Sequence, residues 1–448
     1  MLHSSARAAA ACGALVACVA FSRTAAAGDF VPSLSLQGGV TATRTPGANT
    51  DDFFVAATPQ LIYFFEGERT LYTIGYSFTG SLNTELPNGI ANRLAFAAAT
   101  DLTPRTRLVL GADALQSLIG NYLLVKRAAA TQLGNVPSLN TSLLTVGVTQ
   151  GISYEITPVV RFSQGVTGTY VTSLDPDVDL KNYLATGTLN LDRSWEFDAV
   201  GAELGIQYSR TNFPPVPEFQ AFTIALGPTW DHDLTTNLST SLGASAQVVF
   251  SPDRGTAPAR IGPAGRASIF YSSDASGIGL DAVAGIEPNL LVGTLLQSQQ
   301  VVLRGYTPIS ERNRIIFGVS GGYLHAKSLD LSSRGIFANE FEAVLHDADI
   351  TWAATDYLSI FLRYQFIGQG QGSGPGATPP IVRHGAIIGV DLFASRPAER
   401  ARLPKTGAPR RVDRGDAQQL GRSPSGSGSS GSGSSGSSGS GGSGGSRR

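Results

Sequence analysis

Residues 53–83 read FFVAATPQLIYFFEGERTLYTIGYSFTGSLN, and this stretch decides the fold class. On both sides of the turn at Glu66–Arg69, apolar residues recur at every second position. The positions between them are mostly Ser, Thr, Gly and Gln. A period of two places alternate side chains on opposite faces of a β-strand. The stretch therefore predicts a β-hairpin with one apolar face and one uncharged polar face.

The same unit recurs about nine times along the chain, which predicts about eighteen strands, with sixteen as the alternative count. Links after even-numbered strands are short, as at 102–104 and 155–158, whereas most links after odd-numbered strands are longer, as at 116–141 and 251–265. An exposed strand face in a soluble protein would be rich in Lys and Glu, but this chain has only four lysines. We expect an all-β fold, a transmembrane antiparallel up-and-down β-barrel.

The overall composition agrees with a large sheet. The chain has 448 residues, of which 15% are charged and 42% apolar, and its formal net charge is −1. This charge balance gives no reason to expect a nucleic-acid partner. No run of eighteen apolar residues occurs, which argues against a helical membrane protein.

The two ends differ from the repeated pattern. Residues 1–27 resemble a signal peptide with cleavage after Ala27, although residues 15–18 also resemble a lipobox that would make Cys18 a lipidation site. Residues 28–395 form the expected barrel. Residues 396–448 are rich first in Arg and Pro and then in Gly and Ser, a composition that predicts a disordered tail.

The alternation of link lengths predicts the orientation. Outer-membrane barrels have short periplasmic turns and longer external loops, so both termini are expected in the periplasm of a Gram-negative cell.

The expected partners are outer-membrane lipid and the barrel-assembly machinery. The last strand fits a barrel-insertion signal at Arg383, Gly385, Ile388 and Val390. Aromatic residues near strand ends, among them Tyr306, are expected at the membrane interfaces.

Eighteen strands enclose a lumen too wide for side chains to fill. Charged residues on the predicted inward parity are candidates for its lining: Arg107, Asp113, Arg161, Glu203, Asp281, Arg304, Asp347, Asp349 and Arg363. Both signs are present, which predicts a weakly selective pore. These charges could simply hydrate the wall, or they could form a transverse field at a constriction. The unusually apolar link 116–141 could enter the pore or extend the fifth strand outward.

The sequence gives little material for catalysis, cofactor binding or metal binding. The cluster of His346, Asp347 and Asp349 is the nearest approach to a metal site, but strand alternation places His346 on the opposite face from both acids. No serine has a histidine at an obvious same-face spacing. We therefore expect no enzyme activity, no cofactor and no metal.

The hairpin formed by residues 91–100, the turn 102–106 and residues 108–114 resembles outer-membrane barrels of exopolysaccharide systems. It is similar in pattern and length to the eighteen-stranded polysaccharide-secretion porins of myxobacteria, over most of residues 28–395. The resemblance implies a conduit for secreted exopolysaccharide and a periplasmic polysaccharide-export protein as partner. Two alternatives stay open: a general passive diffusion porin, and a non-conducting structural protein tethered through its tail.

Overall fold

The computed structural model describes residues 29–393, apart from 119–141, 176, 214–215, 253–258, 274–275, 290–293, 311–313, 330–339, 371 and 373–379. These residues form eighteen strands in one sheet. The strands are β1 (Asp29–Thr45), β2 (Ala48–Glu66), β3 (Thr70–Asn83), β4 (Gly89–Thr103), β5 (Thr106–Leu118), β6 (Ser142–Thr157), β7 (Val160–Ser173), β8 (Lys181–Ser194), β9 (Asp198–Phe213), β10 (Val216–Asp233), β11 (Leu238–Phe250), β12 (Arg260–Ser272), β13 (Gly277–Asn289), β14 (Thr294–Pro308), β15 (Ile315–Leu329), β16 (Glu340–Thr355), β17 (Leu358–Gln369) and β18 (Ile381–Phe393).

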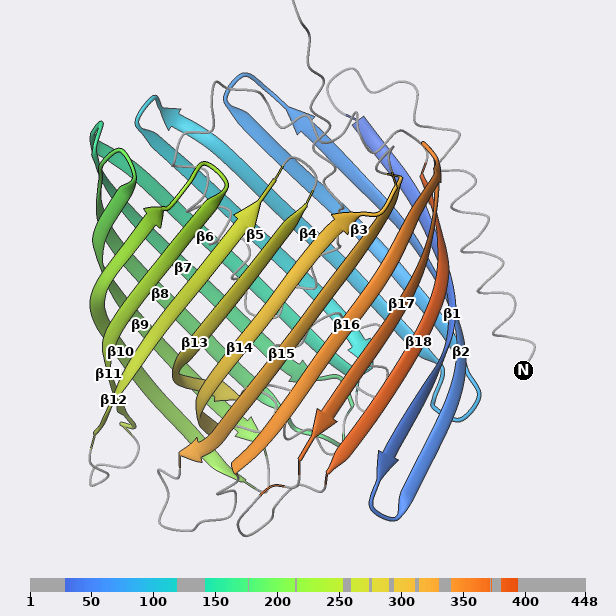
Figure 1. Cartoon of the computed structure of the whole chain (residues 1–448). Helices are drawn as coiled ribbons and strands as arrows, with labels where there is room; N and C mark the ends of the chain where they lie inside the picture. The colour runs from blue at the N-terminus through green and yellow to red at the C-terminus, as the bar shows by residue number, and fades with distance from the viewer. Residues whose placement is uncertain are drawn as a thin grey trace, which may run out of the picture.

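The sheet is closed on itself (Figure 1). Each strand pairs antiparallel with its neighbours in the chain, and β18 pairs with β1 from Ser33↔Phe393 to Arg44↔Val382. Every strand therefore has a neighbour on each side and the sheet has no edge strand, which is what a sheet in lipid requires. The predicted fold, an eighteen-stranded antiparallel up-and-down barrel, is confirmed.

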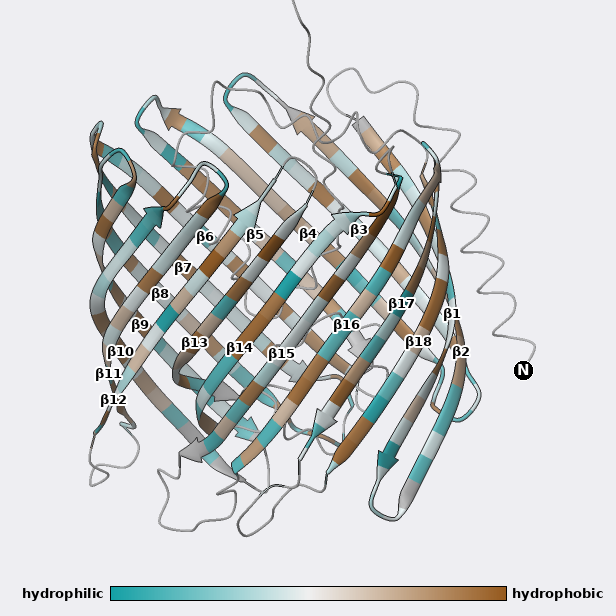
Figure 2. Cartoon of the chain, viewed as in Figure 1, coloured by the Kyte–Doolittle hydropathy of each residue, from teal (hydrophilic) through white to brown (hydrophobic). Residues whose placement is uncertain are grey.

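The outer face is apolar. The most exposed large apolar side chains of the strands share one parity, and they include Phe53, Val55, Leu82, Leu94, Leu191, Leu226, Ile261 and Ile388. Figure 2 shows the resulting alternation of hydrophobic and hydrophilic residues along individual strands. Such a surface is stable in contact with lipid, so the barrel is a transmembrane one. Among the described residues, no helix is long and apolar enough to cross a membrane.

The two ends of the barrel differ. The links after even-numbered strands, such as 104–105 and 158–159, lie at one end, together with the first residue of β1 and the last residue of β18. We call this the turn end, and it is at the top of Figure 1. The other end, here the loop end, carries links such as 46–47 and 84–88.

Several strands are longer than the sequence pattern suggests. The hairpin β1–β2 turns at residues 46–47, and β12 begins at Arg260, six residues before the stretch 266–272 in which the alternation predicts a strand. Gln116, Ser117 and Leu118 are the last residues of β5, which pairs there with the first residues of β6. Alternation fades near the loop end, so the sequence pattern predicts shorter strands there than the structure shows.

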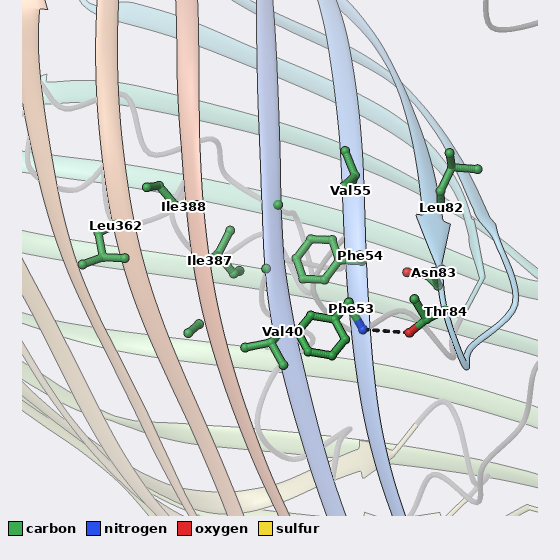
Figure 3. Close-up of a pocket in the computed structure, with 13 residues that line it drawn as sticks. Val40, Phe53, Phe54, Val55, Leu82, Asn83, Thr84, Leu362, Ile387 and Ile388 are labelled. Atoms are coloured by element: carbon green, nitrogen blue, oxygen red, sulfur yellow. Dashed lines mark hydrogen bonds between the residues drawn. The ribbon is translucent and has the colours of Figure 1, made fainter.

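The seam where β1 and β18 meet is packed on both faces. Phe54, Phe361 and Ile387 form a buried cluster on the inner side. On the outer side a groove of about 620 Å³ lies between the ridge of Phe53, Val55 and Leu82 and the ridge of Leu362 and Ile388. Figure 3 shows these side chains and the hydrogen bond of 3.0 Å from the Phe53 backbone N to Thr84 Oγ1. The groove belongs to the lipid-facing surface.

Candidate functional site in the barrel lumen

The inner face of the barrel can be recognised from long contacts between side chains. Glu203 of β9 and Arg266 of β12 form an ion pair, although β10 and β11 lie between their strands. Such a contact is possible on the concave side of a closed sheet, where side chains converge. The ladder registers place all nine charged residues proposed from the sequence on the same face as this pair.

Four ion pairs follow one another around the inner face. Their closest N–O distances are 3.8 Å for Arg161–Asp192, 2.8 Å for Arg266–Glu203, 3.9 Å for Arg304–Asp281 and 3.9 Å for Arg363–Asp347. Each member lies in the middle of its strand or in the half nearer the turn end. We call these eight residues the charged belt. Because each Arg faces a carboxylate, the belt has no net charge and presents both signs to the lumen.

Two members of the charged belt, Asp192 and Arg266, were not among the residues predicted from the sequence. Asp192 alternates with Leu189 and Leu191, so strand parity alone would have placed it inside. Arg266 is the first residue of the stretch 266–272 in which the alternation predicts a strand, so no preceding residue supported its inward parity. In the structure, β12 continues back to Arg260, and Arg266 lies at its centre.

The inner face is not polar throughout, although the sequence pattern predicts a polar face opposite the apolar one. In the half nearer the loop end, many inward positions hold buried apolar side chains: Phe54, Ala91, Leu143, Val171, Leu184, Ala221, Val249, Leu296, Leu324, Ala326, Phe341 and Ala343. Five of these residues form one cluster on β14, β15 and β16. The charged belt therefore lies toward the turn end, whereas the inner face toward the loop end combines buried apolar side chains with buried polar ones such as Asn182 and Thr223.

The loop end of the β13–β14 hairpin departs from the cylinder. The ladder between β12 and β13 runs from Ser272↔Gly277 only to Gly265↔Ala284, although both strands continue toward the loop end. The ladder between β13 and β14 continues to Asn289↔Thr294. The hairpin stays intact while it separates from β12, and Figure 1 shows β13 curving near its lower end. We call residues 285–289 and 294–296 the hairpin tip.

The hairpin tip lies over the inner face of β11 and β12. Ile286 packs with Leu295 against two inward residues of β10 and β11, Ala221 and Val249. A β-carbon at Gly262 of β12 would lie 3.8 Å from Ile286 Cδ1. The Gln247 side chain of β11 accepts a hydrogen bond of 2.8 Å from the Ile286 backbone N and donates one of 3.4 Å to its carbonyl oxygen. Gln247 thus replaces the ladder bonds that β12 no longer supplies, and the tip narrows the lumen.

We expect Gln247→Ala to raise the conductance of the barrel. The substitution removes both hydrogen bonds to Ile286 and leaves its backbone groups without a partner, at a cost of about 1–3 kcal/mol. The hairpin tip would then leave the inner face of β11 for part of the time. Single-channel recording measures this as larger and noisier current steps. Gln299→Ala, on the outer face of β14, is the matched control, and equal conductance of all three proteins would contradict this role of the tip.

The remaining proposed residues lie as follows. In β18, Arg383 and Gly385 of the proposed insertion signal are on the inner face, and Ile388 and Val390 are on the outer face. Arg383 Nε donates a hydrogen bond of 3.0 Å to Thr43 Oγ1 across the seam. The cleavage site at Ala27, the alternative lipidation site at Cys18, residues 119–141 and the tail from 396 onward lie outside the described residues.

Among the described residues, no group of three or more His, Cys, Asp and Glu side chains could hold a metal ion. His346 is on the outer face of β16, whereas Asp347 and Asp349 are on the inner face, where Asp347 pairs with Arg363 and accepts a hydrogen bond from Gln365. The chemistry that the inner face offers is hydration, ion pairing and hydrogen bonding with solutes.

No protein-family model matches the chain, and no curated protein matches it. Solved structures with similar shape include OccK2 (OpdF) of Pseudomonas aeruginosa in complex with glucuronate, at 11% identity and a TM-score of 0.43, covering 82% of this chain and 98% of that one. OpdK of Pseudomonas aeruginosa with vanillate matches at 9% identity and a TM-score of 0.42, covering 82% and 99%. The ferric-catecholate import receptor Fiu of E. coli K12, in its open form, matches at 10% identity and a TM-score of 0.40, covering 80% and 81%. At these scores the likeness carries no argument about function, which has to rest on the residues of this chain.

Proposed function

We propose that this protein is an outer-membrane channel through which small polar solutes diffuse passively. The observation that carries the proposal is the charged belt on the inner face of a closed barrel whose outer face is apolar. Charged side chains on a lumen wall keep water in the lumen, because ions lose much free energy when they are taken out of water. A wet lumen across a lipid layer is a route for polar solutes.

The arrangement of the lumen suggests how the channel selects solutes. The charged belt carries both signs, so it favours neither cations nor anions strongly. The hairpin tip, held by Gln247, narrows the lumen toward the loop end and sets an upper limit on solute size. We place the turn end in the periplasm and the loop end outside the cell, because outer-membrane barrels have their short links on the periplasmic side.

Planar-bilayer recording tests this function directly. We expect the purified, folded protein to produce stepwise currents, on the order of a nanosiemens in concentrated KCl, as suits a water-filled lumen of this strand number. Reversal potentials in a salt gradient should stay close to zero. The heat-unfolded protein is the control and should give no steps. A correctly folded barrel that is electrically silent would rule out the channel and favour the non-conducting structural protein.

Polysaccharide export stays a prediction from the sequence resemblance, and so does a periplasmic polysaccharide-export protein as partner. Insertion by the barrel-assembly machinery and contact with outer-membrane lipid are part of the same proposal. Deletion of the gene in its host separates the two functions. Loss of secreted polysaccharide would favour export, whereas slower uptake of small polar solutes would favour passive diffusion.

A further inference from the structure

Two aromatic rings lie on the lumen side of β13 near the turn end. Phe270 of β12 pairs with Gly279, and Tyr306 of β14 pairs with Gly277. A β-carbon at Gly279 would lie 2.9 Å from Phe270 Cδ2, and one at Gly277 would lie 2.7 Å from Tyr306 Cε1. Each ring therefore occupies the space that the missing side chain leaves. The two glycines are two positions apart along β13, or about 7 Å.

Both rings are open to the lumen. Phe270 is 42% exposed and Tyr306 is 45% exposed, although both are on the inner parity together with Asp281 and Arg304. The sequence pattern placed Tyr306 at the membrane interface, and the register corrects this. Each ring therefore presents apolar surface to the lumen, and a ligand with an apolar face of its own can cover that surface.

A pair of opposite charges lies next to the rings. Asp281 follows Gly279 on the inner face of β13, and Arg304 is the ladder partner of Gly279. The closest approach of Arg304 Nη2 to Asp281 Oδ2 is 3.9 Å, and the two side chains are 56% and 45% exposed. A loose, exposed pair of this kind can donate hydrogen bonds through the guanidinium and accept them through the carboxylate.

We propose that Phe270, Tyr306, Asp281 and Arg304 form a binding site for the pyranose rings of a saccharide. The electronegative face of an aromatic ring attracts the C–H bonds on the apolar face of a sugar. The hydroxyl groups of the sugar need both donors and acceptors, which Arg304 and Asp281 supply. A simple organic anion fits less well, because Asp281 would repel it. Two neighbouring units of one oligosaccharide can contact both rings.

The site rests on the proposed channel function and adds a substrate class to it. It lies at the end of the lumen that we assign to the periplasm. Asp281 and Arg304 are also members of the charged belt, so a saccharide in this part of the lumen would contact the aromatic rings and the belt together. Weak, repeated contacts of this type raise the concentration of the saccharide inside the lumen while each contact stays short-lived.

Oligosaccharide block of the channel current tests the site. Malto-oligosaccharides and cello-oligosaccharides are added on both sides of a bilayer that contains wild-type channels, and we expect brief current interruptions that increase with sugar concentration. Phe270→Ala and Tyr306→Ala should each raise the half-blocking concentration about tenfold. Phe270→Trp should keep the block. Tyr271→Ala is the matched control, because Tyr271 is 43% exposed on the outer face of the same strand and its loss should change nothing.

The outcomes separate the site from the channel. Current steps in salt without block by either sugar would contradict the binding site but not the channel function. Equal block in wild type and in the Phe270→Ala, Tyr306→Ala double variant would do the same. Absence of current steps would contradict the proposed channel function. Calorimetric titration of the detergent-folded variants with the same sugars would then test saccharide binding independently of conductance. Heat-modifiable migration on gels verifies that each variant has folded.

Discussion

The double variant Ile388→Asp, Val390→Asp will fail to insert into membranes. Both side chains lie on the outer face of β18, and Ile388 is 60% exposed there. Given the rise and tilt of a barrel strand, Ile388 lies about 12 Å from the turn end, close to the middle of the apolar band. Each carboxylate costs up to about 2 kcal/mol at this depth. The pair would remove a large part of the roughly 5–15 kcal/mol that stabilises a typical folded protein.

Gel mobility with and without heating measures the result, since a folded barrel migrates differently from its heated form. Far-UV circular dichroism in detergent gives an independent reading of strand content. The matched control is Gln37→Asp, which adds one carboxylate on the inner face of β1, opposite Gly389. This control should insert normally because its charge faces water. Normal heat-modifiability of the double variant would mean that the outer face of the closing strand has been assigned wrongly.

Removal of three of the four arginines from the charged belt will make the channel cation-selective. The triple variant Arg161→Gln, Arg266→Gln, Arg304→Gln leaves three carboxylates without partners, those of Asp192, Glu203 and Asp281. The lumen then has a net negative charge. Its field reaches about 10 Å into the pore at 0.1 M salt, so the K⁺ to Cl⁻ permeability ratio should rise several-fold. The reversal potential in a KCl gradient measures this ratio.

The opposite variant supplies the internal check. Asp192→Asn, Glu203→Gln, Asp281→Asn leaves the three arginines and should shift the reversal potential toward anion selectivity. Arg210→Gln removes an arginine that pairs with Glu218 on the outer face, and it should leave selectivity unchanged. Both shifts should shrink as salt concentration increases. Identical reversal potentials for the two triple variants would show that the charged belt does not face the permeation path.

Much of the site followed from local alternation. Once Phe53 and Val55 were assigned to the outer face, strand parity placed residues such as Arg107 and Glu203 on the inner one. Parity says nothing about depth or partners, so the ion pair between Glu203 and Arg266 could not be foreseen. It depends on which strands lie side by side in the closed sheet. The same limit explains Tyr306, whose nearness to a strand end suggested the membrane interface although its register is inward.

Local alternation predicts about eighteen strands, their antiparallel order and the apolar outer face, because each of these depends on neighbours within a strand or across one link. The ion-pair partners of the charged belt and the departure of the hairpin tip from β12 are visible only in the folded barrel. The tip depends on Gln247 reaching Ile286, which is 39 residues away in the chain and two strands away in the sheet. Alternation has a range of two residues, whereas this contact requires the curvature of the closed barrel to bring the two strands together.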